Sequence, residues 1–200
     1  MSHPVVSRET KEKLRHFLNL LKKWNPKINL VAKSTINEAW DRHIEDSIQV
    51  FDCRPDAYGG WVDLGSGGGF PGLVVAILSQ EFYPNSSVTM IESDVRKATF
   101  LRTVLRETDT AGTVLAERIE SATPQNAEVV SARALAPLDH LLGYCAPHIA
   151  EGGVALLPKG ASWKKELDQA LQTWRFDWEI TTSKTQADAV VMKIRNITNA

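Results

Sequence analysis

The chain has 200 residues, of which 43% are hydrophobic and 24% charged, and this composition is that of a folded domain rather than a disordered segment. Its two cysteines, Cys53 and Cys145, exclude a disulfide framework and any zinc site built from Cys-x-x-Cys pairs. No apolar run approaches the roughly 18 residues of a membrane helix, and the first turns lack the apolar core of a signal peptide. We therefore expect a cytoplasmic protein with no membrane segment and no metal site.

The net charge of −1 conceals an uneven distribution. Residues 1–33 contain eight basic and two acidic side chains, a balance of +6, so the rest of the chain carries −7. Such asymmetry indicates either a surface that faces a polyanion or a lysine-rich helix face in solvent. Under the first interpretation, Lys22, Lys23 and Lys27 are candidate contacts to RNA phosphates.

The first part of the chain is predicted to be helical. Apolar residues three or four positions apart predict a helix over residues 7–24, which Asn25-Pro26 should end. The capping-box pattern Thr35-x-x-Glu38 predicts a second helix that continues to Phe51. We interpret residues 1–57 as a helical cap in the same compact unit as a second domain, residues 58–200.

From residue 60 onward, short apolar runs alternate with helical patterns. Strands are predicted at residues 61–64, 88–91, 113–116, 128–131 and 154–157, and helices at 72–80, 95–106, 138–149 and 163–173. Two late strands, 178–182 and 189–194, have only a short polar loop between them and should pair antiparallel. The alternation predicts an α/β fold with a mostly parallel sheet and helices on both faces.

A glycine-rich segment follows the first predicted strand. Gly67-x-Gly69-x-x-Gly72 has the spacing of a dinucleotide-binding loop, and Glu92 lies 20 residues further on, where a carboxylate can accept hydrogen bonds from ribose. Glycines at these positions let the backbone turn tightly and approach a nucleotide. In this strand-loop-helix context the motif predicts a nucleotide-like cofactor.

Asp63 favours one class of cofactor over another. A carboxylate at the strand tip is badly placed beside a pyrophosphate, but it suits a cationic ligand with an amino group, such as S-adenosylmethionine. The chain also lacks the second substrate domain of most dehydrogenases. Methyl transfer is therefore favoured over hydride transfer.

Several further segments narrow the interpretation, and together they cover about residues 24–160. They are Trp24-Asn-Pro-Lys-Ile-Asn-Leu30, Arg42-His-Ile-Glu-Asp-Ser47, the glycine segment 63–72, Arg96-Lys-Ala-Thr-Phe-Leu-Arg102, Arg118-Ile-Glu120, Val129-Val-Ser-Ala-Arg-Ala134 and Pro158-Lys-Gly160. In these segments the chain resembles the RsmG family, also called glucose-inhibited division protein B (GidB). The resemblance implies a class I methyltransferase that uses S-adenosylmethionine to methylate N7 of a guanine in 16S ribosomal RNA, leaving S-adenosylhomocysteine.

The same resemblance assigns roles to individual positions. It implies that Gly65 and Phe70 contact the cofactor, that Ile119 and Glu120 flank its adenine, and that Arg133 lies beside both cofactor and target base. No role is carried onto the last 40 residues, which match only loosely.

The chemistry of guanine N7 asks little of the protein, because N7 has a lone pair and no proton. Alignment and tolerance of positive charge suffice, and no general base is required. We leave the catalytic residue unassigned, with Arg133 and Lys159 as positioning candidates and with Arg42 and His43 as further candidates for RNA contact. Both cysteines are interpreted as packing residues.

Two other functions remain open from the sequence. One is a non-catalytic protein that binds RNA or the ribosome and retains a nucleotide pocket, and the other is a small-molecule methyltransferase. A dehydrogenase is a more distant alternative. On the favoured interpretation the partner is 16S rRNA or the small ribosomal subunit, and the protein is a monomer.

Overall fold

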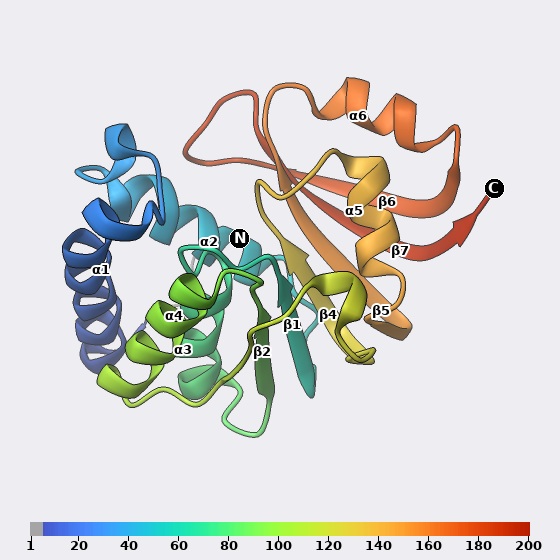
Figure 1. Ribbon diagram of the computed structural model, residues 1–200. Helices are drawn as coiled ribbons and strands as arrows, with labels where there is room; N and C mark the ends of the chain where they lie inside the picture. The colour runs from blue at the N-terminus through green and yellow to red at the C-terminus, as the bar shows by residue number, and fades with distance from the viewer. Residues whose placement is uncertain (1–5) are drawn as a thin grey trace.

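The apolar runs form one seven-stranded sheet in the computed structural model, which describes residues 6–200 (Figure 1). Its strands are β1 (Gly60–Leu64), β2 (Ser87–Ile91), β3 (Thr113–Leu115), β4 (Ala127–Ala132), β5 (Ile149–Lys159), β6 (Trp174–Thr182) and β7 (Val190–Asn199). They lie in the order β3-β2-β1-β4-β5-β7-β6, with the first five parallel and β7 antiparallel to both of its neighbours. The predicted fold class is therefore confirmed, and so is the antiparallel pairing of the two late strands.

Helices cover the two faces of the sheet (Figure 1). They are α1 (Arg8–Ile28), α2 (Glu45–Asp52), α3 (Gly72–Phe82) and α4 (Val95–Glu107) on one face, and α5 (Leu138–Cys145) and α6 (Trp163–Ala170) on the other. Side chains alternate along β1, so Trp61 packs into the first core and Val62 and Leu64 pack into the second. Strand order reverses between β1 and β4, and in open α/β sheets ligands bind beyond the carboxyl ends of the strands at such a point.

The N-terminal helix is longer than its sequence suggests. Pro26 lies inside α1, and the helix ends only at Ile28, so the predicted stop at Asn25-Pro26 is wrong. The end is set instead by the side chain of Asn25, whose oxygen accepts hydrogen bonds from the backbone N–H groups of Leu30 (2.8 Å) and Val31 (2.9 Å). Pro26 has no backbone N–H to donate to the carbonyl of Lys22, yet the helix continues for two residues beyond it.

The second predicted helix is broken into three parts. Residues 33–35 form the short turn η1 (Lys33–Thr35), a π-helical turn η2 (Trp40–Ile44) follows, and α2 begins only at Glu45. No side-chain hydrogen bond caps η2 or α2, and the Thr35 hydroxyl instead donates to the carbonyl of Ala32 at 2.9 Å. The predicted continuous helix over 35–51 is therefore wrong, and the π-turn presents its side chains differently from an α-helix.

The segments before and after residue 58 share one core. Leu14 and Phe17 of α1 and Phe51 of α2 are fully buried in the same cluster as Trp61 of β1 and Phe100 of α4. Within residues 6–200, no helix is both long and apolar enough to cross a membrane.

The predicted boundaries in the C-terminal part also need correction. Helix α5 ends at Cys145, before the predicted end at 149, because β5 already begins at Ile149. Strands β6 and β7 are longer than predicted, and their register runs from the Trp174–Asn199 pair to the Thr182–Val190 pair. The helical pattern was extended too far because both a helix and a buried strand supply apolar residues.

Candidate active site

The glycine-rich segment joins β1 to α3, and a Cβ would lie within 3.0 Å of another atom at four of its glycines, which are Gly65, Gly68, Gly69 and Gly72. Gly65 has a left-handed φ of 63°, and a Cβ there would lie 2.7 Å from Cδ1 of Leu135. A Cβ at Gly72 would lie 2.6 Å from a carboxylate oxygen of Asp63 and 2.8 Å from Met90. The glycine spacing recognised in the sequence therefore serves close packing of the loop against strand, helix and neighbouring loop.

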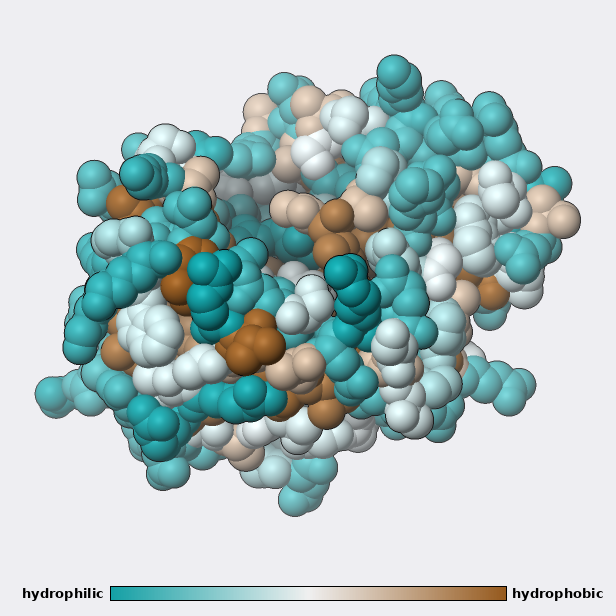
Figure 2. All heavy atoms as spheres, in the orientation of Figure 1, coloured by the Kyte–Doolittle hydropathy of each residue, from teal (hydrophilic) through white to brown (hydrophobic). Residues whose placement is uncertain are grey.

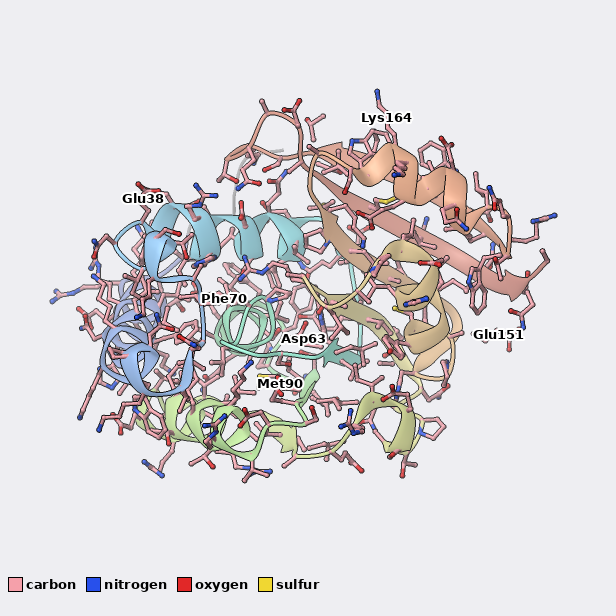
Figure 3. All side chains as sticks on the ribbon, turned by 45° about the horizontal axis from the view of Figure 1, so that its top comes forward. Glu38, Asp63, Phe70, Met90, Glu151 and Lys164 are labelled. Atoms are coloured by element: carbon pink, nitrogen blue, oxygen red, sulfur yellow. The ribbon has the colours of Figure 1, made fainter. Side chains whose placement is uncertain are left out.

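Asp63 lies beneath this loop rather than at the surface of a cavity, and it is 1% exposed (Figure 3). One carboxylate oxygen accepts from the Ser131 hydroxyl at 2.7 Å, and the other accepts from the Gly72 N–H at 3.2 Å. Burial raises the pKa of Asp63 to about 6, although these hydrogen bonds favour the ionised form. The expectation that Asp63 faces a cationic ligand is wrong, because the carboxylate holds the loop and the start of α3 to the sheet.

A first cavity of about 420 Å³ opens between the glycine loop and the ends of β2 and β4. Glu92 borders it, and its two oxygens accept from the backbone N–H groups of Gly67 (2.7 Å) and Asp94 (2.8 Å). The short turn η3 (Ile119–Ser121) contributes two further lining residues, Ile119 and Glu120. This volume lies within the usual range of small-molecule sites.

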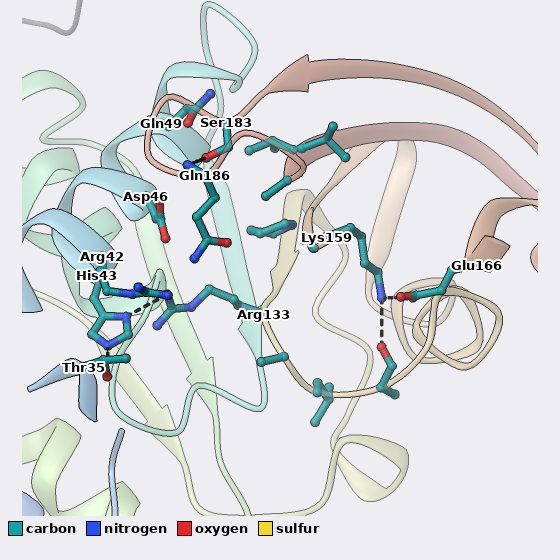
Figure 4. A pocket seen from close by; sticks show the side chains of 18 of the residues that line it. Thr35, Arg42, His43, Asp46, Gln49, Arg133, Lys159, Glu166, Ser183 and Gln186 are labelled. Atoms are coloured by element: carbon teal, nitrogen blue, oxygen red, sulfur yellow. Dashed lines mark hydrogen bonds and ion pairs between the residues drawn. The ribbon is translucent and has the colours of Figure 1, made fainter. Parts of the chain in front are cut away.

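A second cavity of about 490 Å³ lies between the π-turn, the start of α2 and the ends of β4 and β5 (Figure 4). The two cavities share the lining residues Arg133, Ala134 and Leu135, which follow β4. Ala134 has a left-handed φ of 52°, a strained conformation for a residue with a side chain. The space-filling view shows this face of the molecule hollowed between the N-terminal helices and the C-terminal part of the chain (Figure 2).

A chain of hydrogen bonds holds Arg133 between the cavities. Nη1 of Arg133 lies 3.1 Å from Nδ1 of His43, and Nε2 of His43 lies 3.0 Å from the Thr35 hydroxyl (Figure 4). Arginine can only donate, and the Thr35 hydroxyl donates to Ala32. His43 is therefore neutral, with its proton on Nε2 and with Nδ1 accepting from Arg133.

The electrostatics of this pair agree with that assignment. Burial, together with the charges of Arg133 and Arg42, lowers the pKa of His43 to about 4. Burial also lowers the pKa of Arg133, while Asp46 and Asp63 act in the opposite direction. The guanidinium of Arg133 lies 5.1 Å from the centre of the Phe70 ring, a cation–π contact.

Lys159 lies at the end of β5 and is 8% exposed. Its ammonium donates to the carbonyl of Ala136 (2.9 Å) and to Glu166 (2.7 Å), and the same Glu166 oxygen accepts from the Leu138 N–H at 3.1 Å. Burial alone would raise the pKa of Glu166, but the hydrogen bonds from Lys159 and Ser162 hold it below the usual value. The Lys159–Glu166 pair therefore fixes the segment that follows Arg133 against α6.

Residues 10–197 match the family described as rRNA small subunit methyltransferase G. A protein named ribosomal RNA small subunit methyltransferase G from a Ruegeria species is 54% identical over 192 residues, which cover 96% of this chain and 93% of that one. The chain belongs to this family. A protein of the same name from Paramagnetospirillum magneticum is 45% identical over 192 residues, covering 96% of this chain and 91% of the relative.

Solved structures share the fold at much lower identity. The methyltransferase PaMTH1 of Podospora anserina, bound to SAH, has a TM-score of 0.62 at 11% identity, covering 95% of this chain and 88% of that one. A TehB-like SAM-dependent methyltransferase of Corynebacterium glutamicum has a TM-score of 0.59 at 13% identity, covering 90% and 98%. The fold is that of class I methyltransferases, and the resemblance to the RsmG family is confirmed.

The structure brings most of the predicted site residues of this family member into the two cavities. The first cavity is lined by all six residues assigned to the cofactor, which are Gly65, Phe70, Glu92, Ile119, Glu120 and Arg133. The second is lined by Arg42, His43, Arg133 and Lys159.

Three of the predicted RNA-contact residues lie elsewhere. Lys22, Lys23 and Lys27 are exposed on α1 and line neither cavity. Lys23 and Lys27 instead border a separate hollow between α1 and α4, beside Trp24 and Arg106. The helical periodicity of α1 could place them on a solvent face, but it could not say which opening they adjoin.

Sequence reasoning missed the residues that close the second cavity from its far side. The side chain of Gln49 donates to the carbonyl of Thr182 (2.6 Å) and accepts from the Lys184 N–H (3.1 Å), which ties α2 to the β6–β7 loop. Asp46 accepts from the Thr185 hydroxyl of the same loop. No local pattern signals these contacts, because their partners are more than 130 positions apart.

Both cysteines pack as predicted. Cys145 is fully buried in the second core, and burial raises its pKa to about 12. Burial also raises the pKa of Cys53, so neither thiol is an activated nucleophile.

Proposed function

We propose that this protein transfers a methyl group from S-adenosylmethionine to N7 of a guanine in 16S ribosomal RNA. In this proposal the first cavity holds the cofactor and the second receives the base. The observation that carries it is the meeting of the two cavities at Arg133, Ala134 and Leu135, which gives a cofactor and a substrate base one point of contact. The names of the relatives support ribosomal RNA of the small subunit as the substrate.

The lining of the first cavity suits S-adenosylmethionine. Glu92 is an acceptor for ribose hydroxyls, because each of its oxygens has a second lone pair beyond the backbone N–H that it already binds. Ile119 supplies an apolar surface for adenine, and Glu120 an acceptor for its amino group. The charged lining offers acceptors for the positive groups of the ligand and donors for its carboxylate, and consists of Glu92, Glu117, Glu120, Lys97, Arg118 and Arg133.

The reaction needs alignment more than proton transfer. When bound, S-adenosylmethionine would supply an electrophilic methyl group for attack by the N7 lone pair, and the electron pair of the broken carbon–sulfur bond would stay on sulfur. The positive charge passes to the base and no proton is released, so a general base has nothing to remove.

The side chains at the junction fit this chemistry. His43 is not free to act as a base, because Nδ1 accepts from Arg133 and Nε2 already carries a proton that Thr35 accepts. Arg133 is held in place by His43 and Phe70, and Lys159 fixes the following segment through Ala136. We assign Arg133 and Lys159 positioning roles, since holding the base at attack distance can supply much of the rate.

Contacts to the RNA backbone are assigned to the positive surfaces around the second cavity. Arg42 is exposed at the border of this cavity. Its Nη1 lies 3.9 Å from a carboxylate oxygen of Glu38, which makes a weak surface ion pair. Lys22, Lys23 and Lys27 of α1 extend this positive character away from the cavity. We expect the protein to act as a monomer in the cytoplasm, on 16S rRNA or the small subunit.

Mapping of ribosomal RNA tests the proposal. Mass spectrometry of 16S rRNA from cells with and without the gene should differ by one 7-methylguanine, and the purified protein should restore it with S-adenosylmethionine. Transfer to small molecules without RNA would favour the small-molecule alternative. Tight cofactor binding without any transfer would favour a non-catalytic RNA-binding protein, and quenching of tryptophan fluorescence by NADH would favour a dehydrogenase.

A further inference from the structure

Most polar side chains that line the second cavity already have their hydrogen-bonding partners. Gln49 uses both ends of its amide on the β6–β7 loop. Lys159 and Glu166 bind each other and neighbouring backbone groups. His43 is engaged on both ring nitrogens. These side chains have little capacity left for a base.

Asp46 and Gln186 are exceptions among the residues that the structure describes. One oxygen of Asp46 accepts from the Thr185 hydroxyl, and no cation lies within ion-pair distance of the carboxylate in residues 6–200. The Gln186 carboxamide has no hydrogen bond to any described side chain or backbone group, although its N–H and C=O hold the loop through Ser183 and Ala189. Figure 4 shows the carboxylate of Asp46, the carboxamide of Gln186 and the guanidinium of Arg133 directed into the same space.

The position of these groups matches one edge of a purine. Asp46 and Gln186 line the second cavity alone, whereas Arg133 lines both. Consider a guanine in the second cavity with N7 toward the first cavity. Its opposite edge, which carries N1–H and the N2 amine, then faces the wall of the second cavity that lies away from the first. The groups with free capacity on that wall are a carboxylate and a carboxamide.

We propose that Asp46 and Gln186 read the target base as guanine, an inference that rests on the proposed function. The Asp46 carboxylate accepts from N1–H and from the N2 amine, and the Gln186 amide donates to O6. Adenine would set an N1 lone pair against the carboxylate and an amine where O6 belongs, so it is rejected. Selectivity of this kind follows when a bound base covers polar groups and the wrong base leaves them unpaired.

The charge around Asp46 suits this role. Arg133 and Arg42 line the same cavity, and the positive charge of Arg133 attracts the Asp46 carboxylate. The hydroxyl of Thr185 anchors one oxygen and leaves the other for the base.

The test combines a near-isosteric variant with a modified base. Asp46→Asn keeps an oxygen for Thr185 but can replace the free acceptor with an amide donor. We expect kcat/KM for an RNA fragment that contains the target guanine to fall on the order of ten- to a hundredfold, mainly through KM. Cofactor binding measured by isothermal titration should not change. Asp41→Asn, at an exposed carboxylate of the π-turn that precedes α2, is the matched control and should behave like the wild type.

The decisive readout uses RNA in which the target guanine is replaced by inosine, which lacks the N2 amine. The wild type should transfer methyl to inosine at least about fivefold less efficiently, and Asp46→Asn should show no such penalty. Gln186→Met should lower activity on both bases equally, since both retain O6. A merely structural Asp46 would leave the inosine penalty intact in the variant.

The outcomes separate the two proposals. If Asp46→Asn retains the wild-type kcat/KM, or loses as much activity on inosine as the wild type does, the proposal that Asp46 recognises guanine is overturned. The proposed methylation of RNA is not affected by either result. If the wild type binds cofactor but transfers no methyl to any RNA fragment or small subunit, the proposed function fails, and this inference fails with it.

Discussion

The first cavity is lined by residues that follow successive parallel strands, whereas the second is closed by segments from opposite ends of the chain. Gly65, Glu92 and Arg133 each lie just beyond the carboxyl end of a strand, at β1, β2 and β4. The second cavity depends instead on Asp46 and Thr185, which are 139 positions apart. The proposed cofactor site is therefore formed by the sheet alone, while the proposed base site also requires the helical cap and the β6–β7 loop to meet.

The largest expected effect concerns the first cavity alone. Gly65→Val places a β-branched residue at a φ of 63°, with its Cβ 2.7 Å from Leu135. We expect binding of S-adenosylmethionine to weaken on the order of a hundredfold or more, measured by isothermal titration. Gly143→Ala in α5, where a Cβ would meet only Trp174 at 3.6 Å, is the control and should bind normally. Normal binding by both variants would remove the glycine loop from the cofactor site.

The second prediction concerns the junction of the cavities. Arg133→Ala removes the guanidinium that lies against Phe70 and leaves Nδ1 of His43 without its donor. We expect single-turnover methylation to slow by roughly a hundredfold, with a much smaller change in cofactor affinity.

A double-mutant cycle with His43→Ala identifies the cause of that loss. If His43 acts by holding Arg133, the double variant should be little worse than Arg133→Ala, with a coupling of about 1 to 2 kcal/mol. Additive losses would mean that the two side chains act separately, and Arg175→Ala at an exposed position serves as the control.

The contrast between the cavities also explains what the sequence could reveal. The glycine spacing and Glu92 are local features of strand-loop-helix units, so they identify the first cavity without a structure. Resemblance to the family supplied Ile119, Glu120 and Arg133, and all three line that cavity. The prediction for Asp63 is wrong because its position two residues before Gly65 in the sequence does not reveal whether the carboxylate is buried. In the structure this carboxylate accepts hydrogen bonds from Ser131 and Gly72.

The second cavity was only partly foreseeable. Arg42 and His43 were found, but the capping-box pattern that predicted a regular helix concealed the π-turn that presents them. Asp46 belongs to a segment that carries the family resemblance, but nothing in the sequence indicated its contact with the β6–β7 loop. Gln49 and Gln186 gave no signal, because a contact across most of the chain depends on tertiary packing and not on local pattern.

Asp63 offers a third test, directed at the support beneath the first cavity. Its pKa of about 6 lies above the ordinary value near 4, so the folded state binds more protons between pH 6 and 4. The free energy of unfolding therefore gains a contribution as the pH falls through this window, of about 2 to 3 kcal/mol at most. Asp63→Asn should lack that contribution.

Denaturant unfolding of both proteins at pH 7, 5 and 4 measures the difference. His43 acts in the opposite direction, since its pKa is lowered to about 4, but it is present in both proteins and cancels. A constant difference between wild type and Asp63→Asn across this range would contradict the raised pKa of Asp63.

A smaller effect is expected from α1, which borders neither cavity. Replacing Lys22, Lys23 and Lys27 by glutamine should weaken RNA binding up to about tenfold and reduce the slope of log affinity against log salt by up to ~2. Cofactor binding and single-turnover rate at saturating RNA should not change. Lys164→Gln with Lys165→Gln on α6 is the control. Wild-type affinity of the triple variant at two salt concentrations would show that the lysines form only a solvated face.

The smallest expected effect is the absence of a pH dependence near neutrality. His43 is neutral above about pH 5, because burial and the charge of Arg133 disfavour its protonated form. The rate at saturating RNA and cofactor should therefore be flat from about pH 7 to 8.5, as expected when N7 attacks without a base. Below pH 5 the rate should fall, because a protonated His43 can no longer accept from Arg133. A change in the rate near pH 6 that is absent in Asp63→Asn would be assigned to Asp63, which supports the glycine-rich loop. An ascending limb near pH 7 that vanishes in His43→Ala would instead make His43 a general base and overturn its assignment as a neutral acceptor.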